Sequence, residues 1–231
     1  MTEHGLMDFD ALHGGEGANL GQDGPRLAAA PWQLDEPQPL VVELADQFTG
    51  PVLDGGCWVG DNALLLAAKG FDVTAVDIAA SAVEQARAKA AARGLDVDFR
   101  VGDATELTDI RTGFNTILDS AMMHCLSDAD RQAWLAAAHR VAAPGARLHV
   151  LCFPDFVAGA FPMPGDLTEA GLRRDIEAHW VITGWEVRRY TTNMDPAALR
   201  DLVPDASMEL AVDDGQGRSL LPIWHIAATR R

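Results

Sequence analysis

Residues 52–60 read VLDGGCWVG and decide the fold of this chain. The apolar start, Val52-Leu53, predicts a buried strand, and the glycine-rich part predicts a tight turn into a helix over 62–69. Gly70 stops that helix, and a second strand is expected over 71–77. Small residues in such a turn let backbone amides approach a ligand, and the N-terminus of the helix that follows favours an anionic group.

The same alternation of short apolar runs and alanine-rich helices continues downstream, which is typical of β-α units and a parallel sheet. Further strands are expected over 97–101, 114–119 and 147–153. Helices are expected over 39–48, 62–69, 81–93, 127–143 and 168–178. Ser81 and Ser127, each followed by an acid three positions later, are the predicted N-caps of two of them, and Pro144-Gly145 is the predicted end of the second.

The last third of the chain predicts three more strands, over 181–190 with an interruption at Gly184, over 207–212 and over 220–229. The last two are joined by a hairpin-type loop at 213–217, so they must pair antiparallel. We therefore expect an α/β fold, a single-domain Rossmann-like three-layer sandwich with a mostly parallel seven-stranded sheet and an antiparallel last strand. Residues 1–36 are glycine-rich and are expected to form a flexible N-terminal arm or lid on the domain at 37–231.

Composition limits the class of protein. The chain has 231 residues, of which 48% are hydrophobic and 23% charged, as in one soluble globular domain. Its formal net charge of -16 argues against a phosphate-neutralising surface, so nucleic acid is not an expected partner. Three cysteines without a C-x-x-C pair, no leader-like start and no long apolar run predict a cytoplasmic protein with reduced thiols and no membrane span.

Acidic residues stand at the ends of the first two predicted strands. In an open parallel sheet, ligands bind beyond the carboxyl ends of the strands, near the point where strand order reverses. Asp77 ends the second strand, 23 positions after Asp54, which is the place for an acid that accepts two ribose hydroxyls. Together with the glycine-rich turn, this acid predicts a nucleoside-containing cofactor.

Five segments then carry a resemblance to a known family. They are the turn at 52–60, VDI at 76–78, GDA at 102–104, LDS at 118–120 and APGAR at 143–147. Their order and content resemble the motif set of the class I S-adenosylmethionine (SAM)-dependent methyltransferases. The regions around residues 31–39, 119–124, 180–182 and 224 further resemble the mycobacterial heterocyclic toxin methyltransferases, which are small-molecule enzymes related to the thiopurine methyltransferases.

The resemblance implies that the cofactor is SAM and implies which residues bind it. The methionine part is expected on Asp54, Gly56 and Gly60, the ribose on Asp77, and the adenine on Asp103 and Ala104. The remaining residues expected at the cofactor are Ile78, Asp119, Ser120 and the capping pair Trp32 and Gln38. Carboxylates accept hydrogen bonds from hydroxyls and exocyclic amines, which suits these positions. For Trp32 the alternative is a residue that only packs against the following helix.

Two positions depart from the family pattern. Trp58 stands where the family usually has a second glycine, and a backbone with φ > 0 there would cost roughly 1–2 kcal/mol. The favoured interpretation is an ordinary backbone with the indole packed on the following helix, and the alternative is an indole that faces the sulfonium. His13 stands where the family has a tyrosine over the substrate, and a solvated histidine is the alternative to a substrate contact.

Methyl transfer requires the nucleophile and the methyl group to be close, aligned and shielded from water. An acidic acceptor also needs a group that takes its proton, and His124 with Asp119 is the predicted catalytic pair. The alternatives are a histidine satisfied by the backbone and an aspartate that caps a loop. The predicted wall for a small aromatic or heterocyclic acceptor consists of His13, Phe153, Phe156 and Phe161.

Two other functions stay open from the sequence. An NAD(P)-dependent oxidoreductase shares the glycine turn and the acid after the second strand, although Gly-x-Gly-x-x-Gly cannot be written across residues 55–60. A non-catalytic SAM-binding protein is conceivable because of Trp58. No metal site is expected, and the sequence leaves open the acceptor atom (O, N or S) and the oligomeric state.

Overall fold

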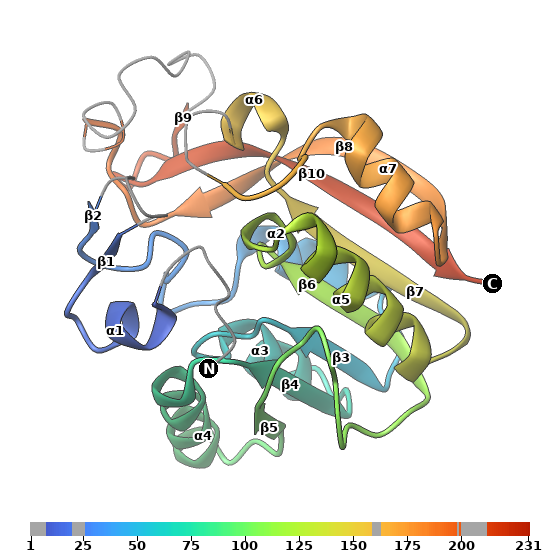
Figure 1. Ribbon diagram of the computed structural model, residues 1–231. Coiled ribbons are helices and arrows are strands. Elements are labelled where there is room, and N and C mark those ends of the chain that lie inside the picture. Colours follow the sequence, from blue (N-terminus) through green and yellow to red (C-terminus); the bar gives the residue numbers. More distant parts are fainter. Residues whose placement is uncertain (1–7, 20–25, 159–162, 198, 200–211) are drawn as a thin grey trace.

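The computed structural model describes residues 8–19, 26–158, 163–197, 199 and 212–231. The main sheet has the strand order β5-β4-β3-β6-β7-β10-β8, with β9 beside β10 (Figure 1). Its strands are β3 (Val52–Gly55), β4 (Val73–Asp77), β5 (Asp98–Val101), β6 (Phe114–Ser120), β7 (Ala142–Cys152), β8 (Trp180–Thr192), β9 (Val212–Asp213) and β10 (Ser219–Arg230). The strands β3 to β7 pair in parallel, whereas β10 is antiparallel to β7 and to β8. The predicted fold is confirmed, and the two-residue β9 pairs antiparallel with one end of β10, as the hairpin-type loop predicts.

Helices cover both faces of the sheet, as expected for three layers. The helices are α1 (Phe9–His13), α2 (Pro39–Leu44), α3 (Asp61–Ala68), α4 (Ala80–Arg93), α5 (Asp128–Val141), α6 (Asp155–Ala158) and α7 (Glu169–Glu177), with the 3-10 turns η1 (Ala45–Gln47) and η2 (Met123–Cys125). Val52 belongs to the core cluster that contains the apolar side chains of α2, α3 and α4. Leu53, the next residue, belongs to the cluster that contains those of α5 and α7. Successive strand residues thus serve opposite faces.

The predicted helix starts are right at two places and wrong at one. Ser127 Oγ accepts from the Asp130 N–H at 3.2 Å, and Thr168 Oγ1 accepts from the Gly171 N–H at 3.1 Å, so both act as N-caps. Ser81 does not cap α4, which begins one residue earlier, because the Ser81 N–H and hydroxyl both donate to Asp10 Oδ1, at 2.9 and 2.6 Å. A partner from a distant segment has replaced the local cap.

The end of α5 also differs from the prediction. The helix ends at Val141, and the residues at 142–145 already belong to β7. Pro144-Gly145 therefore lies inside the start of a strand and does not end the helix. In β8 the pairing with β10 skips Thr183, next to the predicted interruption at Gly184. The strand predicted over 207–212 lies outside the described residues except for Val212.

Much of the N-terminal segment lies against the domain. The short helix α1 packs on α4 (Figure 1), and the hairpin of β1 (Ala18–Asn19) and β2 (Arg26–Leu27) follows it. Leu12, Ala18 and Leu27 are buried in a small third cluster that also contains Trp58. The division of the chain at residue 36 stays a prediction.

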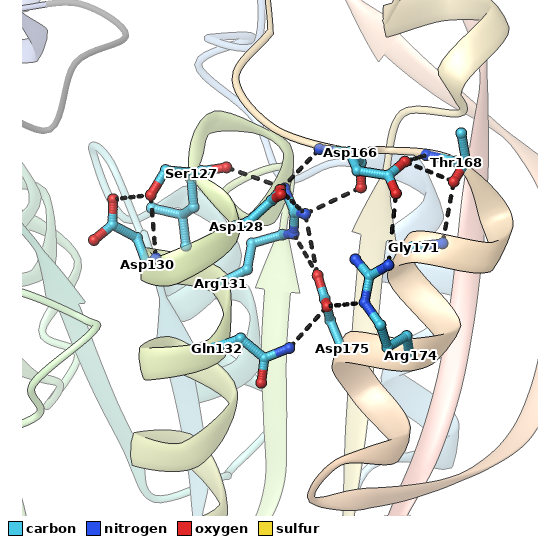
Figure 2. Close-up of polar contacts among 11 residues, drawn as sticks. Ser127, Asp128, Asp130, Arg131, Gln132, Asp166, Thr168, Gly171, Arg174 and Asp175 are labelled. Carbon is cyan, nitrogen blue, oxygen red and sulfur yellow. Dashed lines mark hydrogen bonds and ion pairs between the residues drawn. The ribbon is translucent and has the colours of Figure 1, made fainter.

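A buried ionic network joins α5 to α7 and to the segment before α7 (Figure 2). Arg131 of α5 is fully buried, and its Nε donates to Asp175 Oδ2 of α7 at 3.1 Å. Its guanidinium also donates to Asp128 Oδ1 at 2.5 Å and to the carbonyl groups of Asp166 and Leu126 at 3.0 and 3.2 Å. One side chain thus connects two helices, the residue that precedes α7 by three positions, and the loop after η2.

All three cysteines are free thiols, as predicted. In the described parts of the chain, no helix is both long enough and apolar enough to span a membrane.

Candidate active site

One pocket opens at the carboxyl ends of the parallel strands, where the sheet topology predicts a ligand. Its walls come from the ends of β3, β4, β5 and β6, from η2, and from the N-terminal segment. Seven of the predicted residues line it, namely Trp32, Gly56, Asp77, Ile78, Asp103, Ala104 and Ser120. The other wall residues are Phe9, Trp58, Thr105, Ala121, Met122, Cys125 and Leu126.

Asp77 closes the end of β4 and anchors two turns. Its Oδ2 accepts from the Trp58 N–H at 2.7 Å, and its Oδ1 accepts from the Ala79 N–H at 2.9 Å. Burial raises the pKa of Asp77. Each carboxylate oxygen can accept more than one hydrogen bond, so this fixed carboxylate can still accept a pair of ligand hydroxyls.

Two further acids are buried at the ends of β3 and β6. Both oxygens of Asp54, and Oδ2 of Asp119, are buried without a hydrogen-bond partner among the described residues. Burial, and then the charges of Asp77 and Asp119, raise the pKa of Asp54 to about 7. Burial raises the pKa of Asp119 to about 7, although its Oδ1 accepts from the N–H groups of Met122 and Met123. Such unsatisfied acceptors fit a ligand that brings a cationic donor, as the ammonium group of SAM does.

Two glycines provide room that no other residue would leave. Gly56 has φ +72°, and a Cβ there would lie 2.7 Å from Cβ of Met122. Gly60 precedes α3 with φ +78°, and a Cβ there would lie 2.6 Å from Cζ of Phe99. Gly56 therefore shapes the pocket wall directly, whereas Gly60 allows α3 to approach its neighbours and is not part of the wall.

The turn after β5 supplies another part of the pocket wall. Asp103 Oδ1 accepts from the N–H and the hydroxyl of Thr105, at 2.8 and 2.7 Å, so the turn after β5 holds its carboxylate in place. Ala104 is buried beside it, and Ile78 leaves part of its side chain exposed on the wall. A small residue, an apolar side chain and a carboxylate are the groups that a flat purine with an exocyclic amine requires.

Trp58 differs from the favoured prediction. Its φ is +50°, so the backbone is in the left-handed region and is not ordinary. Its indole packs against the N-terminal segment and not only on the helix that follows. The centroid of its ring lies 5.6 Å from that of Trp32 and 6.4 Å from that of Phe9. The indole N–H donates to Gln33 Oε1 at 2.9 Å. The side chain thus turns toward the N-terminal segment and lines the pocket.

His124 lies behind the pocket wall, between two residues that line it. It is 3% exposed, its Nδ1 accepts from the Phe153 N–H at 3.4 Å, and its ring lies 4.7 Å from the Phe153 ring. Burial lowers the pKa of His124 to about 3, so the imidazole is neutral and its proton is assigned to Nε2. Cys125 does line the wall, and burial raises the pKa of its thiol to about 12.

Besides Asp54, Gly60, Asp119 and His124, three further predicted residues in the described part of the chain are not on the pocket wall. The Gln38 amide donates to the Thr191 carbonyl at 2.8 Å and ties the start of α2 to β8. His13 contacts Ser81 Oγ at 2.9 Å and Gln85 Oε1 at 2.5 Å on α4. Phe153 packs between His124 and Tyr190. The side chain of Phe156, and all of Phe161, lie outside the described residues.

The fold and this acid-lined pocket together define a class I SAM-dependent methyltransferase, and comparison with known proteins agrees. The family described as methyltransferase domain matches residues 52–145. The chain is 34% identical over 203 residues to the 2-heptyl-1-hydroxyquinolin-4(1H)-one methyltransferase of Mycobacteroides abscessus, which covers 84% of this chain and 86% of that protein. The chain belongs to the SAM-dependent methyltransferases, and its cofactor is SAM.

Solved structures give the same result. A structure from work on the conversion of a disulfide bond into a thioacetal group during echinomycin biosynthesis superposes with a TM-score of 0.72 at 30% identity, over 96% of this chain and 91% of that one. A SAM-dependent methyltransferase of Methanosarcina mazei shares the fold, with a TM-score of 0.61 at 19% identity, over 84% and 98%. The predicted enzyme class is therefore confirmed. None of these relatives supports an oxidoreductase or a non-catalytic SAM-binding protein.

Proposed function

We propose that this methyltransferase moves the methyl group of SAM to an oxygen, nitrogen or sulfur atom of a flat, small heteroaromatic molecule. The observation that carries this proposal is the composition of the pocket, whose wall combines the carboxylates of Asp77 and Asp103 with aromatic and apolar side chains. The relative from M. abscessus supports it, since the name of its substrate describes a hydroxylated quinolone ring with an alkyl chain.

Residues of this chain account both for binding the cofactor and for placing the acceptor. When bound, SAM supplies an electrophilic methyl group on a positively charged sulfonium. In the proposed arrangement Asp77 accepts the ribose hydroxyls, Asp103 accepts the adenine amine, and Asp54 offers its buried oxygens to the ammonium group. The apolar wall, including Met122 and Trp58, excludes water and holds the acceptor in line.

Asp119 and His124 remain our candidates for the reaction, Asp119 as a catalytic residue and His124 as a positioning residue. Asp119 lies at the end of β6 with one unsatisfied oxygen and a pKa raised by burial to about 7, which suits a group that shares a proton near neutral pH. His124 is a weak base, because burial lowers its pKa to about 3. Its bond from the Phe153 N–H supports a positioning role, in which it holds β7 against η2.

The finer setting of the reaction is also proposed. We infer a cytoplasmic enzyme whose partner is its small-molecule acceptor and not a nucleic acid, because the net charge of -16 repels phosphates. We also infer that residues 1–36 act as a lid on the domain at 37–231. Phe9 and Trp32, which both belong to that segment, line the pocket and support this inference.

Calorimetry and a turnover assay test the proposal in sequence. S-adenosylhomocysteine (SAH) should bind with a Kd of about 1–10 μM, whereas NADH should give no heat. Heteroaromatic compounds with a hydroxyl, N–H or thiol group, including 2-heptyl-1-hydroxyquinolin-4(1H)-one, should then gain one methyl group in the presence of SAM. Tight SAH binding with no methylated product from any of these compounds would contradict the proposed acceptor class.

A further inference from the structure

The indole of Trp58 connects two parts of the pocket. These are the glycine-rich turn after β3, where SAM is proposed to bind, and the N-terminal segment. We propose that Trp58 is a specificity-determining residue, which fastens the N-terminal segment over the pocket and provides one wall of the acceptor site. This inference rests on the proposed function, because it names the residue that selects a flat aromatic acceptor.

In the described part of the chain, the aromatic ring contacts of the indole and its hydrogen bond are with the N-terminal segment. Trp58 is 7% exposed, and its ring meets those of Phe9, His13 and Trp32 at centroid distances of 6.4, 5.4 and 5.6 Å. Interplanar angles of 70°, 83° and 75° make each contact edge-to-face, the arrangement that aromatic rings prefer. Phe9, Trp32 and Trp58 all line the pocket, so the same cluster that attaches the segment also faces the ligand.

The side chain and the backbone of Trp58 have separate tasks. The backbone N–H donates to Asp77 Oδ2 at 2.7 Å and so supports the cofactor half of the pocket. Any residue with the same backbone conformation would make that bond, and glycine adopts positive φ without strain. Replacing Trp58 with glycine therefore removes the aromatic wall and keeps the bond to Asp77.

The N-terminal segment has a second attachment, which does not involve the pocket. Asp10 accepts from Ser81, and His13 contacts Ser81 and Gln85, so α1 is also held on α4 by polar bonds. None of these four polar residues lines the pocket. The structure thus shows a polar attachment of the segment to α4 and an aromatic attachment that also lines the pocket, and His13 takes part in both.

Steady-state kinetics and calorimetry of Trp58→Gly and Trp58→Phe test this inference. We expect Trp58→Gly to raise KM for the heteroaromatic acceptor at least tenfold, or about 1.4 kcal/mol, while Kd for SAH stays within about threefold. Trp58→Phe should lie between Trp58→Gly and the unchanged enzyme. Trp185→Phe is the matched control, because Trp185 packs on Trp224 outside the pocket, and it should behave as the unchanged enzyme.

An unchanged acceptor KM in Trp58→Gly, or an equal loss of SAH affinity, would overturn the inference. Gln33→Leu removes the partner of the indole N–H, together with an exposed 3.3 Å bond to Asp35 Oδ1, and keeps the indole itself. It should also raise KM for the acceptor, which keeps the inference testable if Trp58→Gly fails to fold. Hydrogen exchange of the α1 amides provides a readout that does not need turnover. With SAH bound, it should accelerate about tenfold in Trp58→Gly and stay unchanged in Trp185→Phe. Unchanged hydrogen exchange in Trp58→Gly would contradict the inference, whether or not an acceptor reacts. A failure of every acceptor to react would contradict only the proposed function.

Discussion

Trp58 holds its backbone at φ +50°, a region that costs an L-residue roughly 1–2 kcal/mol. The conformation persists because it is over-determined. The N–H of Trp58 is bound to Asp77, and the indole is bound to Gln33 and packed among three rings. Strain retained next to a ligand pocket is typical of a functional position.

Comparison of Trp58→Ala with Trp58→Gly isolates this strain. Both variants lose the indole, but only alanine keeps a Cβ at positive φ. We therefore expect Trp58→Gly to be more stable than Trp58→Ala by about 1–2 kcal/mol in urea unfolding. Equal stabilities, or a more stable alanine variant, would show that the backbone relaxes when the indole is removed.

The buried acids predict how the stability of the ligand-free protein depends on pH. The ordinary pKa is 3.8, and burial raises the pKa values of Asp54 and Asp119 to about 7 in the folded protein. Between about pH 4 and 7 Asp54 and Asp119 hold more protons in the folded protein than in the unfolded chain, so their contribution to the free energy of unfolding should fall as pH rises. His124 and His149, whose pKa values burial lowers to about 3, contribute in the opposite direction. The contribution of Asp54 is therefore measured as the difference between the unchanged protein and Asp54→Asn in urea unfolding across this pH range.

The same acids make SAH binding pH-dependent. The ammonium group of SAH favours the charged carboxylates, so SAH should bind several-fold more tightly at about pH 8 than at about pH 6 and should release protons. Calorimetry in buffers of different ionisation enthalpy measures both effects. Asp54→Asn should weaken binding and flatten the pH dependence, and a pH-independent Kd in the unchanged protein would be inconsistent with this account.

At the scale of elements, the parts that depend on local residues follow the sequence and the parts that depend on distant partners do not. Ser127 and Thr168 cap their helices because the bonds lie within one turn. Ser81 has the same sequence pattern, but Asp10 takes its N–H and its hydroxyl from 71 positions away. No pattern within the α4 sequence could have indicated that contact.

The network around Arg131 supports a stability prediction for α5 and α7. Arg131 is fully buried, and Arg131→Met leaves the buried Asp175 carboxylate without its main cation. The free energy of unfolding should fall by roughly 3 kcal/mol, because the buried carboxylate then keeps only the more exposed Arg174 as an ionic partner. Arg131→Met with Asp175→Leu should recover much of that loss in urea unfolding. A double variant as unstable as the single one would mean that the contacts to Asp128 and Asp166 dominate.

At the scale of the whole molecule, the sheet brings together strand ends that are far apart in the sequence, from Gly55 at the end of β3 to Ser120 at the end of β6. The carboxyl ends of parallel strands lie at the same edge of the sheet, so the sequence could predict which residues meet in one pocket. These residues are Gly56, Asp77, Asp103 and Ser120. Of the aromatic wall only Trp32 was predicted at the cofactor, because the rest depends on how the N-terminal segment and η2 fold back over that edge. The part of the wall formed by η2 was indicated only by the apolar run around His124, and the residue predicted there was the histidine.

A transfer experiment with labelled SAM tests the central claim most directly. The enzyme is mixed with SAM that carries a deuterated methyl group, with 2-heptyl-1-hydroxyquinolin-4(1H)-one, and with an aliphatic alcohol of similar size, and the products are read by mass spectrometry. A pocket with an aromatic wall beside the SAM site predicts that the deuterated methyl group appears on the quinolone and not on the alcohol. Equal labelling of both compounds, or no transfer by a protein that binds SAH, would contradict the account.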